Sequence, residues 1–273
     1  VSNVPLPEVS GATYDASSGV LTVSGTNFVK KIGSGNDIDV SKLSITGEGG
    51  SSYRLTSNDV EVSSSTQFSV TLNAADQLNV GGLLNKNETS SDGGTSYNLA
   101  AADDWVAGAE ASADISDTSG NAITVSNVAN PTLSSAAFNA SSGVLTVTGT
   151  NFVKKNGSSN DIDVSKFSIT GEGGSSYTLT SSAVEVSSST QFSVTLNAAD
   201  QLNVGGLLNK NGTSSDGGIT YNLAAADNWL AGAAASDDIS DTSGNGITVS
   251  NVPLPEVSGA TYDASSGVLT VSG

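Results

Sequence analysis

The chain contains no cysteine, no histidine and no methionine. Disulfide bonds are therefore impossible, and metal sites built from thiolate or imidazole ligands are excluded. Catalytic centres of the Ser-His-Asp or Cys-His kind lack their base, because that base is an imidazole. We therefore expect no enzymatic activity. The absence of cysteine does not assign a compartment, since an oxidising compartment permits disulfides without requiring them.

Basic residues are scarce. The 273 residues include 9 Lys and Arg against 27 Asp and Glu, which gives a formal net charge of −18. Such a chain repels nucleic acids and anionic membrane surfaces and attracts cations. No stretch approaches a length of about 18 consecutive apolar residues, so the sequence predicts no membrane span. The abundance of small polar residues with only 13% charged residues is typical of extracellular β proteins.

The sequence does contain a long repeat. Residues 143–155 nearly reproduce residues 19–31 at an offset of 124, and residues 249–273 are identical to residues 1–25 at twice that offset. Solenoid repeats are shorter and cannot fold singly, whereas a unit of this length can hold its own core. We expect one domain at residues 1–127, a second at 128–251, and the first strands of a third at 252–273. That last fragment cannot bury a core unaided.

Short alternating segments separated by turn signals predict strands within each repeat. In the first repeat we expect strands at residues 9–14, 20–24, 38–46, 53–56, 60–62, 68–72 and 123–128. The clearest alternation places Phe68, Val70 and Leu72 on one face of a strand.

Two short helices are expected to interrupt these strands. The side chain of Asn73 can cap a helix at residues 74–78. Residues 99–106 are the second candidate helix, with Trp105 turned toward the core, and residues 85–95 are expected to form an exposed loop or hairpin. The whole pattern predicts an all-β chain of tandem two-sheet sandwiches with short helical turns.

The connections between repeats are rich in proline. Residues 2–7 and 250–255 each carry two prolines, which fix φ and favour an extended chain. Linkers rich in glycine and serine would behave as flexible coils instead. We therefore expect stiff connectors and an elongated rod of modules.

Residues 19–28 and 143–152, with the sequence Gly-Val-Leu-Thr-Val-Ser/Thr-Gly-Thr-Asn-Phe, resemble the opening of TIG-type immunoglobulin-like domains. More broadly, the chain resembles the tandem immunoglobulin-like repeats of giant bacterial surface and biofilm adhesins. The resemblance implies immunoglobulin-like sandwiches located outside the cell or on the bacterial surface. Many proteins of that kind are rigidified by calcium.

Calcium is the one cofactor that the residues suggest, because it prefers carboxylate, amide and carbonyl oxygens. The candidate ligands lie in a glycine-rich loop and in an acidic turn of each repeat. They are Asn36, Asp37, Asp39, Asp103, Asp114 and Asp117 in the first repeat, and Asn160, Asp161, Asp163, Asp227, Asp238 and Asp241 in the second. The alternative is that these residues are present because Asn and Asp suit turns and helix caps.

Two functions remain open. The leading hypothesis is a structural protein, which forms the stalk of a giant bacterial adhesin or the body of a surface filament or sheath. Its partners are neighbouring repeats of the same chain or other copies, which can associate through exposed strand edges. The alternative is an adhesive module whose loops at residues 85–95 and 209–219 bind a carbohydrate or protein of the cell surface or matrix. Identical copies can support such binding through polyvalency.

Overall fold

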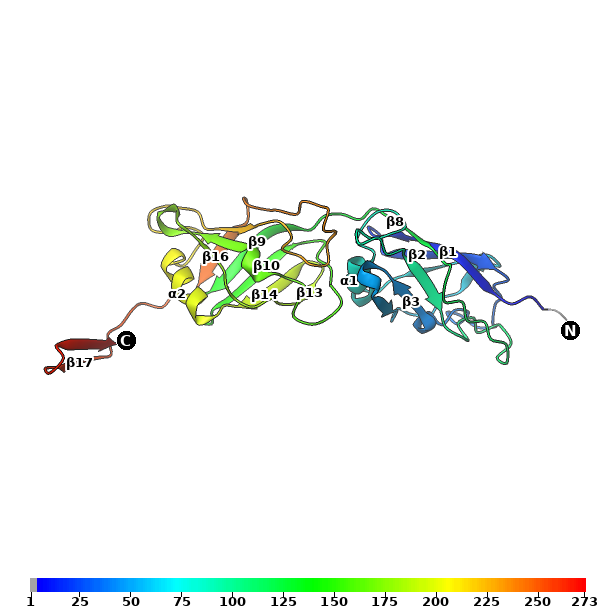
Figure 1. The fold of residues 1–273 in the computed structure, drawn as a ribbon, viewed down its shortest axis with the longest axis horizontal. Coiled ribbons are helices and arrows are strands. Elements are labelled where there is room, and N and C mark those ends of the chain that lie inside the picture. Colours follow the sequence, from blue (N-terminus) through cyan, green and yellow to red (C-terminus); the bar gives the residue numbers. More distant parts are fainter. Residues whose placement is uncertain (1–3) are drawn as a thin grey trace.

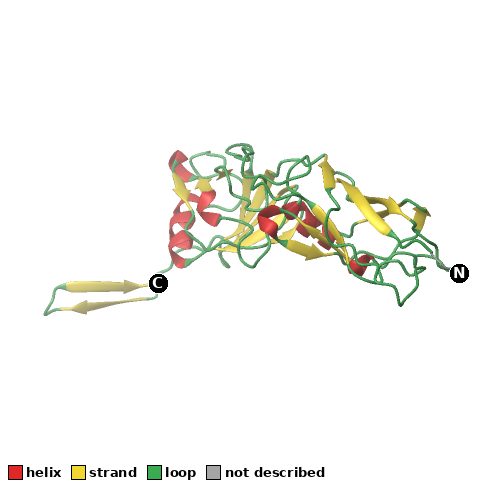
Figure 2. Cartoon of the chain, turned by 45° about the vertical axis from the view of Figure 1, so that its right-hand side comes forward, coloured by secondary structure: helices red, strands yellow, loops and turns green. Residues whose placement is uncertain are grey.

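The computed structural model describes residues 4–273, so residues 1–3, which include the start of the predicted connector at 2–7, lie outside the described residues. We call residues 4–127 the first module and residues 128–251 the second module. The chain is mostly β, with two short α-helices and four 3-10 turns among the described residues, which confirms the predicted all-β class (Figure 2). That residues 1–127 and 128–251 are separate domains, each able to fold alone, stays a prediction.

The elements of the first module recur in the same order in the second module. The first contains β1 Glu8–Asp15, β2 Val20–Thr26, η1 Val40–Lys42, β3 Leu43–Thr46, η2 Glu48–Gly50, β4 Ser52–Arg54, β5 Val62–Ser64, β6 Gln67–Thr71, α1 Ala74–Leu83, β7 Asn98–Ala101 and β8 Ile123–Ser126. The second contains β9 Thr132–Asn139, β10 Val144–Thr150, η3 Val164–Lys166, β11 Phe167–Thr170, η4 Glu172–Gly174, β12 Ser176–Thr178, β13 Val186–Ser188, β14 Gln191–Thr195, α2 Ala198–Leu207, β15 Asn222–Ala225 and β16 Gly246–Ser250.

Each module consists of two sheets that enclose one core. In the first module the sheets have the strand orders β5-β6-β2-β1-β8 and β4-β3-β7. The first strand of the module, β1, pairs antiparallel with β2 and parallel with the last strand, β8. In the second module the corresponding strands have the same neighbours, and one pair, Asn222 with Gly246, joins the two sheets.

The period-two pattern explains which side chains fill the core. Phe68 and Val70 of β6 and the following Leu72 are all buried, as predicted from their alternation. The two tryptophans are buried as well, and Trp105 packs edge-on against Phe28 at a centroid distance of 5.4 Å. Such aromatic contacts add to the hydrophobic stabilisation of a small core.

The helix that begins after Asn73 is confirmed, and it is longer than predicted. The side chain of Asn73 accepts a hydrogen bond from the backbone N–H of Asp76, and α1 continues to Leu83. Neither helix of the described chain has the length and apolar character that a membrane crossing requires.

The helix predicted at residues 99–106 and the continuous strand predicted at residues 38–46 were wrong. Residues 99–106 do not form a helix, because residues 98–101 pair with β3 as strand β7 and a turn follows. Residues 38–46 do not form one strand, since Asp39 caps the 3-10 turn η1 before β3 begins. In both places hydrogen bonds to another segment or to a side chain outweigh local propensity.

The C-terminal hairpin stands apart from both modules (Figure 2). It contains β17 Gly259–Asp263 and β18 Val268–Ser272, which pair in the register that β1 and β2 have in the first module. Tyr262 is 65% exposed, whereas the identical Tyr14 of β1 is 2% exposed. The hairpin therefore has the form of β1–β2 without the core that covers them.

Candidate functional site

The aspartates predicted as calcium ligands in the glycine-rich loop accept hydrogen bonds from the loop and from neighbouring residues. The buried carboxylate of Asp37 accepts hydrogen bonds from the backbone N–H groups of Lys31 at 2.6 Å and Val62 at 3.0 Å. Asp39 accepts hydrogen bonds from the backbone N–H and the hydroxyl of Ser41. In the second module Asp161 has the equivalent partners Lys155 and Val186, and Asp163 has Ser165.

The carboxylate of Glu61, which was not among the predicted calcium ligands, lies beside the loop. The backbone N–H of Asn36 donates to Glu61, and the side-chain oxygen of Asn36 is buried without a hydrogen-bond partner. Asn160 and Glu185 repeat this arrangement. Glu61 was missed because it lies 25 residues away along the chain, and only folding brings it to the loop.

The carboxyl groups of Asp161 and Glu185 lie near each other in the second module, and their pKa values shift in opposite directions. Burial raises the pKa of the Asp161 carboxyl, and the nearby charge of Glu185 acts in the same direction. Burial also acts to raise the pKa of Glu185, but the backbone N–H of Asn160 and the ammonium of Lys154 outweigh it and hold that pKa below its ordinary value. The Lys154 nitrogen lies 3.3 Å from a Glu185 oxygen.

The candidate ligands of the acidic turn are separate acceptors. Each one accepts backbone hydrogen bonds within its own module: Asp103 from Ile115, Asp114 from Ser116 and Asp117 from Val9, with Asp227, Asp238 and Asp241 in the same roles toward Ile239, Ser240 and Leu133. Within residues 4–273 no group of three or more acidic side chains is arranged to hold a metal ion. Calcium binding stays a prediction that calorimetric titration of the chain can check.

The two α-helices reveal a different site. Both have the sequence Ala-Ala-Asp-Gln-Leu-Asn-Val-Gly-Gly-Leu. Leu78 of α1 is 9% exposed and belongs to the core cluster of the second module, whereas Leu202 of α2 is 80% exposed. Because the helices are identical, the difference comes from the second module, which covers α1 (Figure 1). We call this contact the module joint.

Hydrogen bonds connect the two sides of the module joint. The backbone N–H of Lys154 donates to the carbonyl oxygen of Leu78 at 2.9 Å. The amide of Asn85 donates to the carbonyl oxygen of Gly232 at 3.4 Å. The backbone N–H of Ser236 donates to the carboxylate of Asp92 at 2.7 Å. The partners in the second module are backbone groups at fixed positions, so the module joint constrains orientation as well as distance.

Two glycines allow the backbones to approach. A Cβ atom added to Gly81 would lie 2.6 Å from the side chain of Val153, and one added to Gly82 would lie 1.7 Å from the carbonyl oxygen of Lys154. At the equivalent Gly205 of α2 an added Cβ would meet nothing within 4 Å. The glycine pair costs helical stability, which the close contact in the first module explains.

Charged groups lie at the edge of the module joint. Asp92 forms an ion pair with Lys86 at 3.2 Å and is 17% exposed at its side chain. Hydrogen bonds from Ser236 hold the pKa of Asp92 below its ordinary value, and Lys86 adds to the effect. Asp92 is the main cause of the raised pKa of Lys86, to which Glu88 and, from the second module, Asp237 contribute.

A groove of about 410 Å³ runs along the module joint. Its lining includes Tyr14 and Leu78 from the first module and Val128, Asn151 and Val153 from the second, and it contains no charged side chain. The groove therefore offers no group that would fix the orientation of a charged ligand.

The loop at residues 85–95 is part of the module joint. The prediction that this loop is exposed was wrong at Asn85 and Ser91, which are both buried. In the second module the equivalent Asn209 is exposed. The sequence offered one signal of the module joint, namely a leucine and a glycine pair on a helix that needs neither for its own core.

No protein-family model matches the chain, and no curated protein matches its sequence. A solved structure described as the structural basis for Dscam isoform specificity aligns with 94% of this chain at 8% sequence identity and a TM-score of 0.21. This chain covers 54% of that structure's chain, which is about half of its length.

Proposed function

We propose that the chain is a structural protein, namely part of an extracellular array of immunoglobulin-like modules that forms the stalk of a bacterial adhesin or the body of a surface filament or sheath. The observation that carries the proposal is the module joint. Two modules with the same topology meet through a helix on one side and backbone groups on the other.

The module joint supports a stiff array for an energetic reason. A flexible linker would leave Leu78 as exposed as Leu202. Burial of a leucine side chain stabilises the contact by about 2 kcal/mol. Three hydrogen bonds across the module joint then select one orientation of the modules. The angle between modules is set by this contact as well as by the connector.

The position of the helices supports growth along one direction. In Figure 1, α1 lies at the end of the first module that meets the second, and α2 lies at the far end of the second module. A further module placed on α2 in the same way would extend the array without branching. The net charge of −18 keeps such an array soluble and attracts cations to its surface.

The same contact argues against the adhesive alternative for the first module. A binding loop must be free, yet Asn85 and Asp92 of the loop at residues 85–95 contact the second module. Only the loop at residues 209–219 is left uncovered among the described residues, so polyvalent display of identical loops is not favoured.

The proposal is tested by measuring how rigidly the two modules are held. Because the chain has no cysteine, dyes can be placed on the exposed positions Thr71→Cys and Thr195→Cys. Single-molecule energy transfer should show one narrow distance distribution. Leu78→Ser should broaden it, and the matched Leu202→Ser should leave it unchanged. A broad distribution in the unmutated chain would mean that the modules are flexibly linked and that the proposal is wrong.

A further inference from the structure

Both sides of the module joint recur, uncovered, at the other ends of the chain. One side is the helix face, made in the first module by Leu78, Gly81, Gly82, Asn85 and Asp92 and repeated in the second by Leu202, Gly205, Gly206, Asn209 and Asp216. The other is the loop face, made in the second module by Val153, Lys154, Gly232, Ala234 and Ser236 and repeated in the first by Val29, Lys30, Gly108, Glu110 and Ser112.

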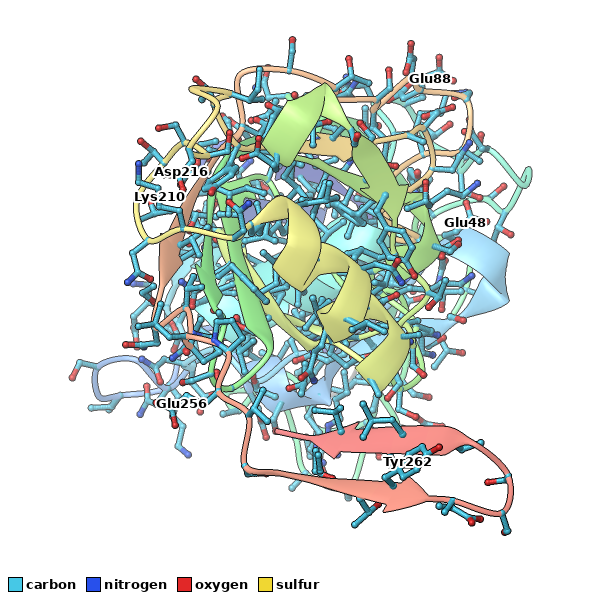
Figure 3. All side chains as sticks on the ribbon, turned by 90° about the vertical axis from the view of Figure 1, so that its left-hand side faces the viewer. Glu48, Glu88, Lys210, Asp216, Glu256 and Tyr262 are labelled. Atoms are coloured by element: carbon cyan, nitrogen blue, oxygen red, sulfur yellow. The ribbon has the colours of Figure 1, made fainter. Side chains whose placement is uncertain are left out.

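No other segment of the described residues 4–273 covers the helix face of the second module. Figure 3 looks onto this end, where α2 crosses the centre of the view and Lys210 and Asp216 lie to one side of it. The side chain of Asp216 is 82% exposed, against 17% for Asp92 in the module joint. The C-terminal hairpin lies below α2 in this view and does not cover it.

The loop face of the first module keeps the local geometry of its counterpart. A Cβ atom added to Gly108 would lie 3.1 Å from a methyl group of Val29, and the corresponding distance from Gly232 to Val153 is 3.0 Å. The glycine differs in its surroundings, because Gly232 is buried in the module joint and Gly108 is exposed. Within residues 4–273, the first module therefore presents a prepared surface that no other segment covers.

One exposed apolar side chain lies on the free helix face, and another follows shortly after Lys30 of the free loop face. Apart from the chain segments at 4–6 and 254–271, Ile32 and Leu202 are the large hydrophobic side chains that the described residues leave exposed. Leu202 belongs to the free helix face. Ile32 occupies the position of Asn156, which lines the same small pocket of the module joint as Leu83 of α1. In an equivalent contact, Ile32 would lie near Leu207. The contact would then bury both Ile32 and Leu202.

The glutamate lies on the helix face in the module joint and on the loop face in the pair of free faces. The first helix face is flanked by Glu88, and its partner loop face carries the buried Ala234. The free helix face has Gly212 in place of the glutamate, and the free loop face has Glu110 in place of the alanine. Across each pair of faces, only one of these two positions is therefore acidic.

We infer that the helix face of α2 is a docking surface for the loop face of the first module of a second copy of this chain. The inference rests on the proposed function, because it applies the module joint between molecules. Such a contact is heterologous and does not close on itself, so repetition produces an open filament. Two separate copies have no covalent linker between the docked faces. Within one chain, a short linker supplies an effective concentration of millimolar order. Without that linker we expect a dissociation constant on the order of 0.1–1 mM.

Disulfide trapping tests the contact directly. A Cβ on Gly81 would lie 3.4 Å from the Cβ of Val153, which is close to the separation found in disulfides. The equivalent pair between molecules is Gly205→Cys on one copy and Val29→Cys on another. Mixed under mild oxidation, these variants should form mixed dimers at least about tenfold faster than Val29→Cys mixed with the exposed Thr195→Cys, as expected for a pre-formed complex.

The full double variant, Val29→Cys with Gly205→Cys, should give a ladder of oligomers. Equal rates for the matched and control pairs would overturn the inference, and so would Gly205→Cys dimerising with itself as fast as with Val29→Cys. The variant Gly81→Cys with Val153→Cys separates the two proposals. If it forms its internal disulfide while the intermolecular pair does not, the proposed function stands and the inference fails. If neither forms, the proposed function fails as well.

Equilibrium sedimentation of the uncrosslinked chain provides the second measurement. Between about 10 µM and about 1 mM the weight-average mass should rise in the unmutated protein. Leu202→Ser and Ile32→Ser should each lower the association constant at least about tenfold, because each removes one buried apolar side chain from the contact. A constant monomer mass over this range, or association unchanged in both variants, would contradict the inference.

Discussion

A Cβ atom on Gly82 would lie 1.7 Å from the carbonyl oxygen of Lys154, so the backbone of α1 touches the backbone of the second module. The same residue in α2, Gly206, would meet nothing within 4 Å. The chain thus carries its own control for the module joint, since one sequence is present in a covered and in an uncovered helix.

Gly206→Ala should therefore stabilise its helix, whereas Gly82→Ala should disrupt the contact between the modules. At Gly206 the alanine should stabilise the second module by about 0.5–1 kcal/mol, because alanine is the better helix former. At Gly82 the added methyl group should separate the modules and broaden the distance distribution between dyes at positions 71 and 195. Denaturant unfolding and energy transfer measure the two effects. If Gly82→Ala leaves the distance distribution narrow, the close backbone contact is not present in solution.

The module joint should weaken in acid. The folded pKa of Asp92 is lowered, first by the hydrogen bonds from Ser236 and then by Lys86. A lowered pKa contributes stability that is present above the ordinary aspartate pKa of about 4 and is lost as the pH falls through the folded value. Energy transfer between the modules should therefore change below pH ~4, and Asp92→Ala should remove much of that change. The control is Asp216→Ala, because the Asp216 side chain is 82% exposed and no other module of the described chain packs against it.

Buried Asp76 should be important for the stability of the first module. Its carboxylate is fully buried and accepts hydrogen bonds from Thr56, Ser57 and Tyr53. Asp76→Asn would place an amide donor among these donors, and we expect a loss of about 2–4 kcal/mol in the free energy of unfolding. Burial acts to raise the pKa of Asp76, but the hydrogen bonds from Ser57 and Thr56 outweigh it, so the net pKa is lowered.

The stabilisation by Asp76 is thus present at neutral pH and lost as the pH falls below ~4. Denaturant unfolding at both pH values should show a smaller difference between Asp76→Asn and the unmutated chain in acid. An equal difference at both pH values would show that the carboxylate charge is not what these donors stabilise. Asp200→Asn provides the same test in the second module, where Thr180 and Ser181 are the donors.

Limited proteolysis should distinguish identical sequences by their structure. Chymotrypsin should cleave after Tyr262 or Leu269 on the order of 100-fold faster than after Tyr14 or Leu21, because cleavage of buried strands requires unfolding of the module. Mass spectrometry of early time points identifies the sites. Cleavage at both pairs with similar rates would mean that the first module is not stably folded.

Much of the fold could be predicted from the sequence where local patterns decide it. Alternation identified the strand that contains Phe68 and Val70, and the capping preference of Asn73 identified the start of α1. The segment at residues 99–106 was misjudged because alanine favours helix locally, while its pairing with β3 depends on residues about 55 positions earlier. Sequence alone carries little information on such distant pairings.

The module joint could not be predicted for a different reason. Leu78 and Leu202 have identical neighbours in the sequence, yet one is buried and the other is exposed. No local pattern distinguishes them, and among the described residues 4–273 only α1 has a complete module packed against it. The predicted calcium ligands illustrate the converse. Asp37 lies in the glycine-rich loop as expected, whereas Asp39 caps η1, and their hydrogen bonds with Lys31 and Ser41 became visible only with the fold.

The parallel pairing of β1 with β8 determines how a module responds to tension. The chain enters the first module at the start of β1 and leaves it at the end of β8, and in a parallel pair these points lie at opposite ends of the ladder. A pull on the two termini therefore shears all the hydrogen bonds of the pair at once and does not open them one by one. The pairing of β9 with β16 places the second module under the same geometry, so each module is built to resist stretching along the chain.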